Sequence, residues 1–391
     1  MARKKLFLFF YIQFFLLGLG GSIFGPLIPI LADGFKVNLD TIGSTLSLSA
    51  FGLLLASLFS GILSEISGKR NIFTLGSILF TASFLGLYFS SHFIYFTLSY
   101  IVFGVSWGMV AVNSTSIISD AFQLNRSKTI IRLNTGFLLG SFFAPILVSG
   151  ILFLNINWRY LFLSVALINV LLFILILSIK LEGLNNKKHK ENFISLFTTN
   201  RKLLSNLIII LCGIINFLHL GLGFTFGAWF TAYFKNLNVP VTIGSLILSL
   251  YLLTFGIGMF VKSSLLTKFN GKKIMQFSSI LAFVFLFISF FLDLVTLKII
   301  FIILFSFSFS GIAATSLSMG IKQSPRNSGS IISIINSFGF TGVIIFQYTA
   351  GYLSENFSVD SVIYIGLVAL FLLAVFTSIL SSCHKFDRKL S

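Results

Sequence analysis

The chain has 391 residues, of which 56% are hydrophobic and only 9% are charged. Soluble domains carry about 25% charged residues, so this composition excludes a water-soluble fold. The net charge of +17 would suit nucleic acid, but the cations lie in short clusters between apolar runs, and none is large enough to follow a phosphate backbone. We expect an integral membrane protein without nucleic acid, cofactor or metal ion, since Cys212 and Cys383 form no metal or redox motif.

Long apolar runs separated by short polar breaks fill the chain. A helix that crosses a bilayer needs about 20 apolar residues, and the runs predict about twelve such spans. Because the runs are continuous, they indicate helices rather than the alternating strands of a β-barrel. The first run is too long for a secretory signal and is interpreted as an uncleaved span. The predicted fold is all-α, with spans at residues 6–31, 41–64, 71–91, 94–118, 130–153, 159–181, 203–231, 241–264, 274–292, 298–320, 329–353 and 359–382.

The loops between these spans differ sharply in charge. All but four of the 27 Lys and Arg residues lie at the chain ends and in one set of alternate loops; the others are Lys36, Arg159, Lys235 and Lys298. Positive residues mark the cytoplasmic side, so both termini and the polar stretch 181–200 are predicted to be cytoplasmic. We interpret that stretch as a solvated linker, while a regulatory or lipid-binding role for its cations is the alternative.

The two halves of the sequence match each other at an offset near 202 residues. Both copies have the same membrane orientation, because six spans precede the second one. The repeat predicts two pseudo-symmetric six-helix bundles, residues 1–181 and 203–391, joined by a linker at 182–202 and related by an axis along the membrane normal. The matches are Phe24-Gly25 with Phe226-Gly227, residues 41–44 with 242–245, Gly68-Lys69-Arg70 with Gly271-Lys272-Lys273, and Asn134 and Gly140 with Asn336 and Gly342.

The loop between the second and third spans carries a motif formed by Gly61, Glu65, Gly68, Lys69 and Arg70. It resembles the Gly-x-x-x-Asp-Arg-x-Gly-Arg-Arg loop of the major facilitator superfamily. The resemblance extends over nearly the whole chain and implies a solute carrier that works by alternating access and is not an enzyme. It also implies a latch between Glu65 and the start of span 11, with Lys69 and Arg70 as its basic members, whereas a purely topological role for these cations is the alternative.

The motif departs from the superfamily pattern at three positions. Glu65 replaces the usual Asp, Ile66 replaces the first basic residue, and in the second half Lys268 stands where the acid should be. Trp158-Arg159 before span 6 also resembles a recurrent superfamily feature. The stretch 25–29 and Asn113 resemble the sugar-permease-like branches.

Span 5 contains small residues at every fourth position, Gly136, Gly140 and Ala144, followed by Pro145. This pattern resembles a fifth-span motif of the superfamily that is associated with antiporters. Helix packing is the alternative, because small residues allow helices to approach closely and proline bends a helix.

Polar side chains in the middle of a span are costly and are candidates for function. By the resemblance, spans 1, 4, 7 and 10 line the substrate site. Hydrogen bonding between helices is the alternative for each residue. No carboxylate lies deep in a span, so His219 is the only deep candidate for carrying a coupling proton. The substrate-binding candidates are Gln13, Asn113, Asn216, His219, Asn336 and Gln347.

Amides and aromatic rings without deep charges suit a neutral, sugar-like solute, since amides both donate and accept hydrogen bonds and rings such as those of Trp107 and Trp229 can cover an apolar sugar face. A multidrug or metabolite exporter of the same fold is the alternative, favoured by the 50 Phe residues. A membrane enzyme is disfavoured because no two His residues lie near each other in the sequence. We expect a monomer in the cell (inner or plasma) membrane.

The charge distribution makes a testable prediction about topology. Reporter fusions after Lys190 and at Ser391 should both read as cytoplasmic, because the cation-rich loops and ends are retained on that side. The measurement is the ratio of cytoplasm-active to outside-active reporter signal at each fusion point. An outside signal at either point would contradict the predicted topology.

Overall fold

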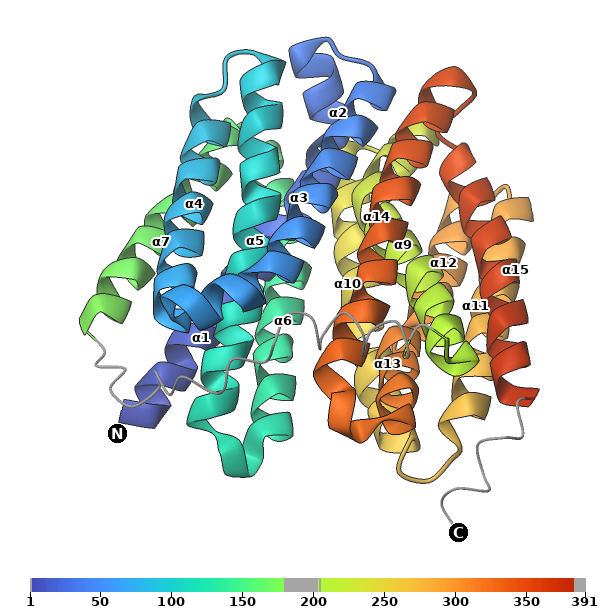
Figure 1. Ribbon diagram of the computed structural model, residues 1–391. Helices are drawn as coiled ribbons and strands as arrows, with labels where there is room; N and C mark the ends of the chain where they lie inside the picture. Colours follow the sequence, from blue (N-terminus) through green and yellow to red (C-terminus); the bar gives the residue numbers. More distant parts are fainter. Residues whose placement is uncertain (1, 179–202, 204, 383–391) are drawn as a thin grey trace. The chain divides into compact units, whose positions relative to one another are not determined.

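The computed structural model describes residues 2–178, 203 and 205–382, and across these residues it contains helices and no strand (Figure 1). Among them, eleven stretches of helix are long and apolar enough to cross a membrane, and Arg159–Leu175 is a shorter apolar helix. The predicted all-α membrane fold is confirmed. The helices of the first half are α1 (Ala2–Ser22), α2 (Phe24–Phe35), α3 (Leu39–Ser67), α4 (Lys69–Phe89), α5 (Phe93–Ala121), η1 (Gln123–Asn125), α6 (Arg126–Phe153) and α7 (Arg159–Ser178).

The helices of the second half follow the same order of long apolar segments. They are α9 (Leu207–Asn236), α10 (Val241–Leu265), α11 (Gly271–Phe291), α12 (Val295–Phe309), α13 (Ile312–Gln323), η2 (Pro325–Asn327), α14 (Ser328–Asn356) and α15 (Ser361–Ser382). Each predicted span therefore corresponds to one helix or to a pair of consecutive helices. The predicted linker at 182–202 lies outside the described residues.

Contacts divide the described chain into two units. The first unit contains residues 2–178 and Gly227–Ser249, and the second contains residues 205–226 and 250–382. The end of α9 and the start of α10 thus pack with the first unit, where Lys235 pairs with Asp33 at 2.8 Å and the Ser249 hydroxyl donates to the carbonyl of Phe142. The division into bundles at the linker stays a prediction from the sequence repeat.

Two of the predicted spans are interrupted. The first breaks between α1 and α2, where Pro26 lacks the N–H that would bond to Ser22 and its ring crowds that carbonyl. The tenth breaks between α12 and α13 at Ser310 and Gly311, and Gly311 has a left-handed φ of 73° that favours glycine. The sequence analysis treated both as continuous because apolar runs say nothing about local dihedral angles.

The two units contain the same close helix contact. In the first unit Gly140 of α6 packs so tightly on α1 that a Cβ would clash with the carbonyl oxygen of Phe15. In the second unit Gly342 of α14 packs on α9 in the same way against the carbonyl oxygen of Phe217. Gly342 lies 202 residues after Gly140, and Phe217 lies 202 residues after Phe15, which is the repeat offset. This equivalence supports the internal repeat.

The glycine pattern of span 5 has a packing role. A Cβ at Gly136 would lie 2.8 Å from the Tyr11 carbonyl oxygen, and the Ser141 hydroxyl donates to the carbonyl of Gly18. Pro145 lies within α6, two turns before the end of the helix. These contacts favour the packing interpretation of Gly136, Gly140 and Pro145 over one specific to antiporters.

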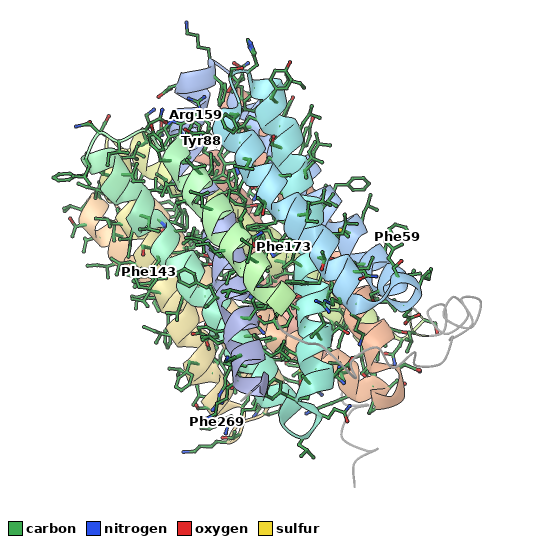
Figure 2. The ribbon with its side chains drawn as sticks, turned by 90° about the vertical axis from the view of Figure 1, so that its left-hand side faces the viewer. Phe59, Tyr88, Phe143, Arg159, Phe173 and Phe269 are labelled. Carbon is green, nitrogen blue, oxygen red and sulfur yellow. The ribbon has the colours of Figure 1, made fainter. Side chains whose placement is uncertain are left out.

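Aromatic side chains fill the interior of the first unit and also cover its outer face. The rings of Phe24, Phe84 and Phe162 are fully or almost fully buried, and those of Phe24 and Phe162 stack at 5.5 Å. Phe59 and Phe143 lie on the outside of the helices (Figure 2). A phenylalanine-rich sequence therefore follows from packing and lipid contact, and does not by itself indicate an apolar substrate.

The helix contact can be tested with glycine substitutions. Gly140→Ala and Gly342→Ala should each destabilise the protein by about 1–3 kcal/mol, because the new methyl group overpacks a helix interface. Gly150→Ala in the same α6 helix is the matched control, since a Cβ there meets nothing within 4 Å. Thermal unfolding of the purified variants measures the effect. Equal unfolding midpoints for Gly140→Ala and Gly150→Ala would contradict the packing role.

Candidate functional site

The two amide candidates of the first unit are fully buried and belong to networks between helices. Gln13 of α1 donates its amide to the Oδ1 of Asn169 at 3.1 Å, and Asn169 donates onward to Ser77 of α4. Asn113 of α5 donates to the Ser60 hydroxyl of α3 at 2.6 Å. In both networks the amide oxygen accepts no hydrogen bond, since Gln13 Oε1 and Asn113 Oδ1 have no partner.

The candidates of the second unit show a related pattern. Asn216 of α9 donates to the Ile335 carbonyl of α14 at 3.2 Å and keeps an unpartnered Oδ1. Gln347 of α14 donates to the Phe224 carbonyl at 3.0 Å. His219 is 2% exposed, and neither of its ring nitrogens has a hydrogen-bond partner. The second unit thus brings Asn216, His219 and Gln347 onto the contact surfaces of α9, α14 and their neighbours.

The remaining amides occupy less enclosed positions. Asn336 is half-buried on α14. Asn134 is exposed on α6 and donates only to the Ile130 carbonyl of its own helix. These two residues are equivalents in the repeat, so their resemblance reflects the duplicated helix rather than a shared buried environment.

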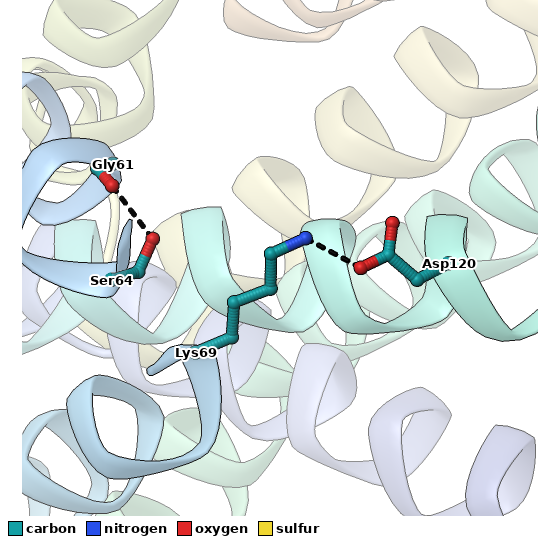
Figure 3. Close-up of polar contacts among 4 residues, drawn as sticks. All are labelled: Gly61, Ser64, Lys69 and Asp120. Atoms are coloured by element: carbon teal, nitrogen blue, oxygen red, sulfur yellow. Dashed lines mark hydrogen bonds and ion pairs between the residues drawn. The ribbon is translucent and has the colours of Figure 1, made fainter. Parts of the chain in front are cut away.

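The motif spans the junction of α3 and α4, where its acid is exposed at the end of α3 and one of its cations is paired at the start of α4. Gly68 has φ of 87°, which favours glycine, and it separates α3 from α4. Glu65 is exposed, and Arg70 is half-buried. Lys69 reaches the Asp120 carboxylate at the end of α5, with 2.5 Å between Nζ and Oδ2 (Figure 3). Nearby, the Ser64 hydroxyl donates to the carbonyl of Gly61 at 2.7 Å.

The pairing of Lys69 with Asp120 has an electrostatic reason. Lys69 is the first residue of α4, and Asp120 lies in the last turn of α5. Each charge therefore stands at the helix end where the macrodipole has the same sign as the charge, which is unfavourable. The ion pair compensates both. The sequence motif does not indicate this partner, because 51 residues separate Lys69 from Asp120.

Lys262 was not predicted to be buried. The loop charge count includes it among the cytoplasmic cations, but Lys262 lies inside α10 and is only 7% exposed. Its ammonium group donates to the carbonyl oxygens of Ser308 at 2.5 Å and Ser310 at 2.7 Å, at the break between α12 and α13. The only sequence signal for its burial was its position within the predicted span, three residues before the end of the helix. A lysine at such a position can point either into the protein or out of it.

Comparison with known proteins settles the family. The sequence model of the Major Facilitator Superfamily matches residues 10–346, and again residues 212–389. The chain belongs to the Major Facilitator Superfamily. It is therefore a multi-pass membrane transporter that works by alternating access, and it is not an enzyme.

Two bacterial proteins of the same name resemble the chain over most of its length. A protein named TsgA homolog from Buchnera aphidicola subsp. Baizongia pistaciae is 22% identical over 376 residues, which cover 94% of each chain. A TsgA homolog from Yersinia pestis (strain Pestoides F) is 21% identical over 348 residues, which cover 88% of this chain and 87% of the relative.

Solved structures of superfamily members share the fold. The nucleoside transporter NupG superposes with a TM-score of 0.78 at 13% identity, covering 99% of this chain and 100% of NupG. The E. coli xylose transporter XylE gives 0.77 at 13% identity, with 97% of both chains covered. The E. coli fucose:proton symporter FucP gives 0.70 at 15% identity, with 97% and 99% covered. At these identities the likeness concerns the fold alone.

The ion pair at the α3–α4 turn yields a prediction about transport. Lys69→Ala and Asp120→Ala should each slow transport by up to about five-fold, because a partly exposed pair contributes about 0.2–1 kcal/mol. The double charge reversal Lys69→Asp with Asp120→Lys should recover part of the loss. The measurement is the initial uptake rate into vesicles, normalised to the amount of protein in the membrane.

Arg132→Ala provides the control for this pair, because Arg132 is an exposed cation near the start of α6, at the same end of the unit. Glu65→Ala and Arg70→Ala belong to the same series and should also slow transport if they form the predicted latch. Uptake rates equal to those of the unaltered protein in all four single variants would show that the motif only sets topology.

Proposed function

We propose that this transporter carries a small hydroxylated solute, with a neutral sugar-like molecule as the preferred substrate. The observation that carries the proposal is the set of buried amide oxygens on Gln13, Asn113 and Asn216 that have no partner. A buried acceptor without a partner costs about 1–3 kcal/mol. Hydroxyl groups of a solute would supply the missing donors.

The names of the structural neighbours support the same substrate class. NupG is named as a nucleoside transporter, XylE as a xylose transporter and FucP as a fucose:proton symporter. All three names denote polyhydroxylated solutes. Because identity to each is low, the amide oxygens carry the proposal and the names of the neighbours agree with it.

Alternating access gives these amides a mechanistic use. A carrier must bind its solute in a cavity that opens to one side at a time, and the binding site of a superfamily member lies between its two repeats. An amide that donates to the protein and accepts from the solute stays oriented when the cavity is empty. The proposal places both termini on the cytoplasmic side of the cell membrane and treats the carrier as a monomer.

Energy coupling follows from the placement of the acids. In the first unit Asp33 is 74% exposed at its pair with Lys235, and Asp120 is held by Lys69. Neither is enclosed within a span. We infer either facilitated diffusion or coupling that uses no carboxylate in the middle of a span, with His219 as the candidate for a coupling proton.

Efflux of an apolar molecule is the second candidate, and one observation favours it. An open groove of about 190 Å³ lies between α3 and α5 on the outer face where Phe59 is exposed, and Ser60 is the only polar residue among its lining side chains, which include Leu55 and Met109. Such a lining suits an apolar solute. Accumulation of an apolar dye in cells that lack the gene, reversed by its expression, would favour efflux over sugar uptake.

The amide site can be tested directly. Purified protein should be stabilised against heating by one class within a panel of pentoses, hexoses and nucleosides. Asn113→Ala and Asn216→Ala should then weaken binding of that solute by roughly 2- to 12-fold each, because one good hydrogen bond contributes about 0.5–1.5 kcal/mol. Titration calorimetry measures the affinity, and uptake into proteoliposomes measures transport.

Asn134→Ala is the matched control, since Asn134 is an exposed amide that bonds only within its own helix. Its affinity should equal that of the unaltered protein. If Asn113→Ala and Asn216→Ala bind the solute normally but unfold at lower temperature, both residues serve helix packing and the proposed site is wrong.

A further inference from the structure

The second unit contains a buried cation without a counter-ion. Lys262 of α10 bonds through its ammonium group to two backbone carbonyls and, among the residues that the structure describes, to no carboxylate. The described acids of this unit, Asp293, Glu355 and Asp360, follow α11 or end α14 and precede α15. They therefore lie at the opposite end of the unit from the end of α10. A buried charge is costly unless it is paired.

The cation lies against the break in the tenth span. A Cβ on Gly311 would stand 3.3 Å from the Lys262 Cδ, so the lysine stem crosses the glycine directly. One turn earlier on α10, a Cβ on Gly258 would stand 2.6 Å from the Phe307 carbonyl oxygen. The carbonyls that bond Lys262 end α12, and α13 begins at Ile312 without a side-chain cap. The first amides of a helix lack internal partners and carry positive dipole charge.

His219 provides a second, independent observation at the same place. Its ring centroid is 4.2 Å from that of Phe309, the last residue of α12, and 6.1 Å from that of Phe255 on α10. Neither ring nitrogen has a hydrogen-bond partner, although the residue is 2% exposed. A neutral imidazole always has one N–H to donate.

We propose that His219, Lys262 and the start of α13 form a binding site for a small oxyanion, a carboxylate or a phosphate. Such a group is the negatively charged partner that Lys262 otherwise lacks. It accepts hydrogen bonds from the third ammonium N–H, from the imidazole N–H and from the free amides at the start of α13. Helix N-termini bind anions in this way. The anion is either an acidic group of the transported solute or a free inorganic ion.

The site explains more than a capping role for Lys262 does. A cation at the carbonyl end of α12 is favourable on its own, and capping uses two of the three ammonium donors. It leaves the third donor and both nitrogens of His219 without a function. An oxyanion accounts for all of them. The inference rests on the proposed transport function, and it refines the chemistry of the substrate or adds a second ligand.

The experiment measures thermal stabilisation of the purified full chain by three probes at matched ionic strength. The probes are sodium phosphate, sodium gluconate and the neutral sugar glucose. We expect saturable stabilisation by phosphate, gluconate or both, and at least a ten-fold higher midpoint concentration in Lys262→Met and in His219→Phe. The second variant keeps the lysine cap in place, so the test survives if Lys262→Met does not fold.

Lys298→Met is the matched control. Lys298 is also buried and also donates to two backbone carbonyls, those of Ser289 and Phe290 at the end of α11, but it lies beside the turn between α11 and α12 and not at a break inside a span. Its loss should lower stability without changing the response to the anion. If Lys298→Met changes that response as much as Lys262→Met does, or if no anion stabilises the native protein, the proposed site is wrong.

The three probes distinguish an anion that is part of the solute from a free inorganic anion. They also allow the anion site and the amide site to be tested separately. Stabilisation by gluconate but not phosphate assigns the acid to the solute and replaces the neutral sugar as preferred substrate. Stabilisation by phosphate, with or without gluconate, assigns a free anion. The Asn113→Ala and Asn216→Ala measurements do not involve Lys262. If no anion stabilises the protein but the Asn113→Ala and Asn216→Ala variants bind the solute more weakly, the anion site is wrong and the proposed transport function stands. If an anion stabilises the protein but the two Asn variants bind the solute normally, only the amide site is wrong.

Discussion

The absence of water from the bilayer core is the constraint on which this structure depends. Inside it each polar group must find a partner within the protein, and most side chains here do so locally. The hydroxyl of Ser106 donates to the Phe103 carbonyl, and that of Thr225 donates to the Gly221 carbonyl. Against this background the unpartnered atoms of Asn113, Asn216 and His219 are informative. Each is a buried polar atom that makes no hydrogen bond within the protein, so it is a candidate for binding a ligand.

The same constraint explains where charges are allowed. Lys69 and Asp120 occur together, because each opposes the dipole of its own helix and each relieves the other. Lys262 and Lys298 form no such ion pair in the described structure, and both instead donate hydrogen bonds to carbonyls at the end of a helix. Helix ends thus account for the partners of Lys69, Lys262 and Lys298. Counting cations by sequence position predicts a side of the membrane but does not predict these partners.

Sequence patterns predicted the spans, the repeat and the family because these depend on composition over about 20 residues or on matching residues far apart. Gly140 and Gly342 show this well, since the repeat pairs them and their close contacts are with equivalent carbonyl oxygens, those of Phe15 and Phe217. The break at Gly311 and the inward turn of Lys262 were missed. They depend on one dihedral angle and on one rotamer, and an apolar run of the same length is compatible with either outcome. The pairing of Lys69 with Asp120 was missed for a related reason, because 51 residues separate the partners.

The contrast between the two buried lysines shows that location, rather than bonding, distinguishes a structural cation from a candidate for function. Lys298 lies in the first turn of α12, close to the chain reversal after α11, and a long stem there can reach the membrane surface. The Lys262 ammonium binds at Ser308 and Ser310, halfway along the span Val295–Gln323. At that depth the two carbonyls supply partial charges but no net negative charge. The oxyanion of the proposed site would supply that net negative charge, which further backbone carbonyls cannot do.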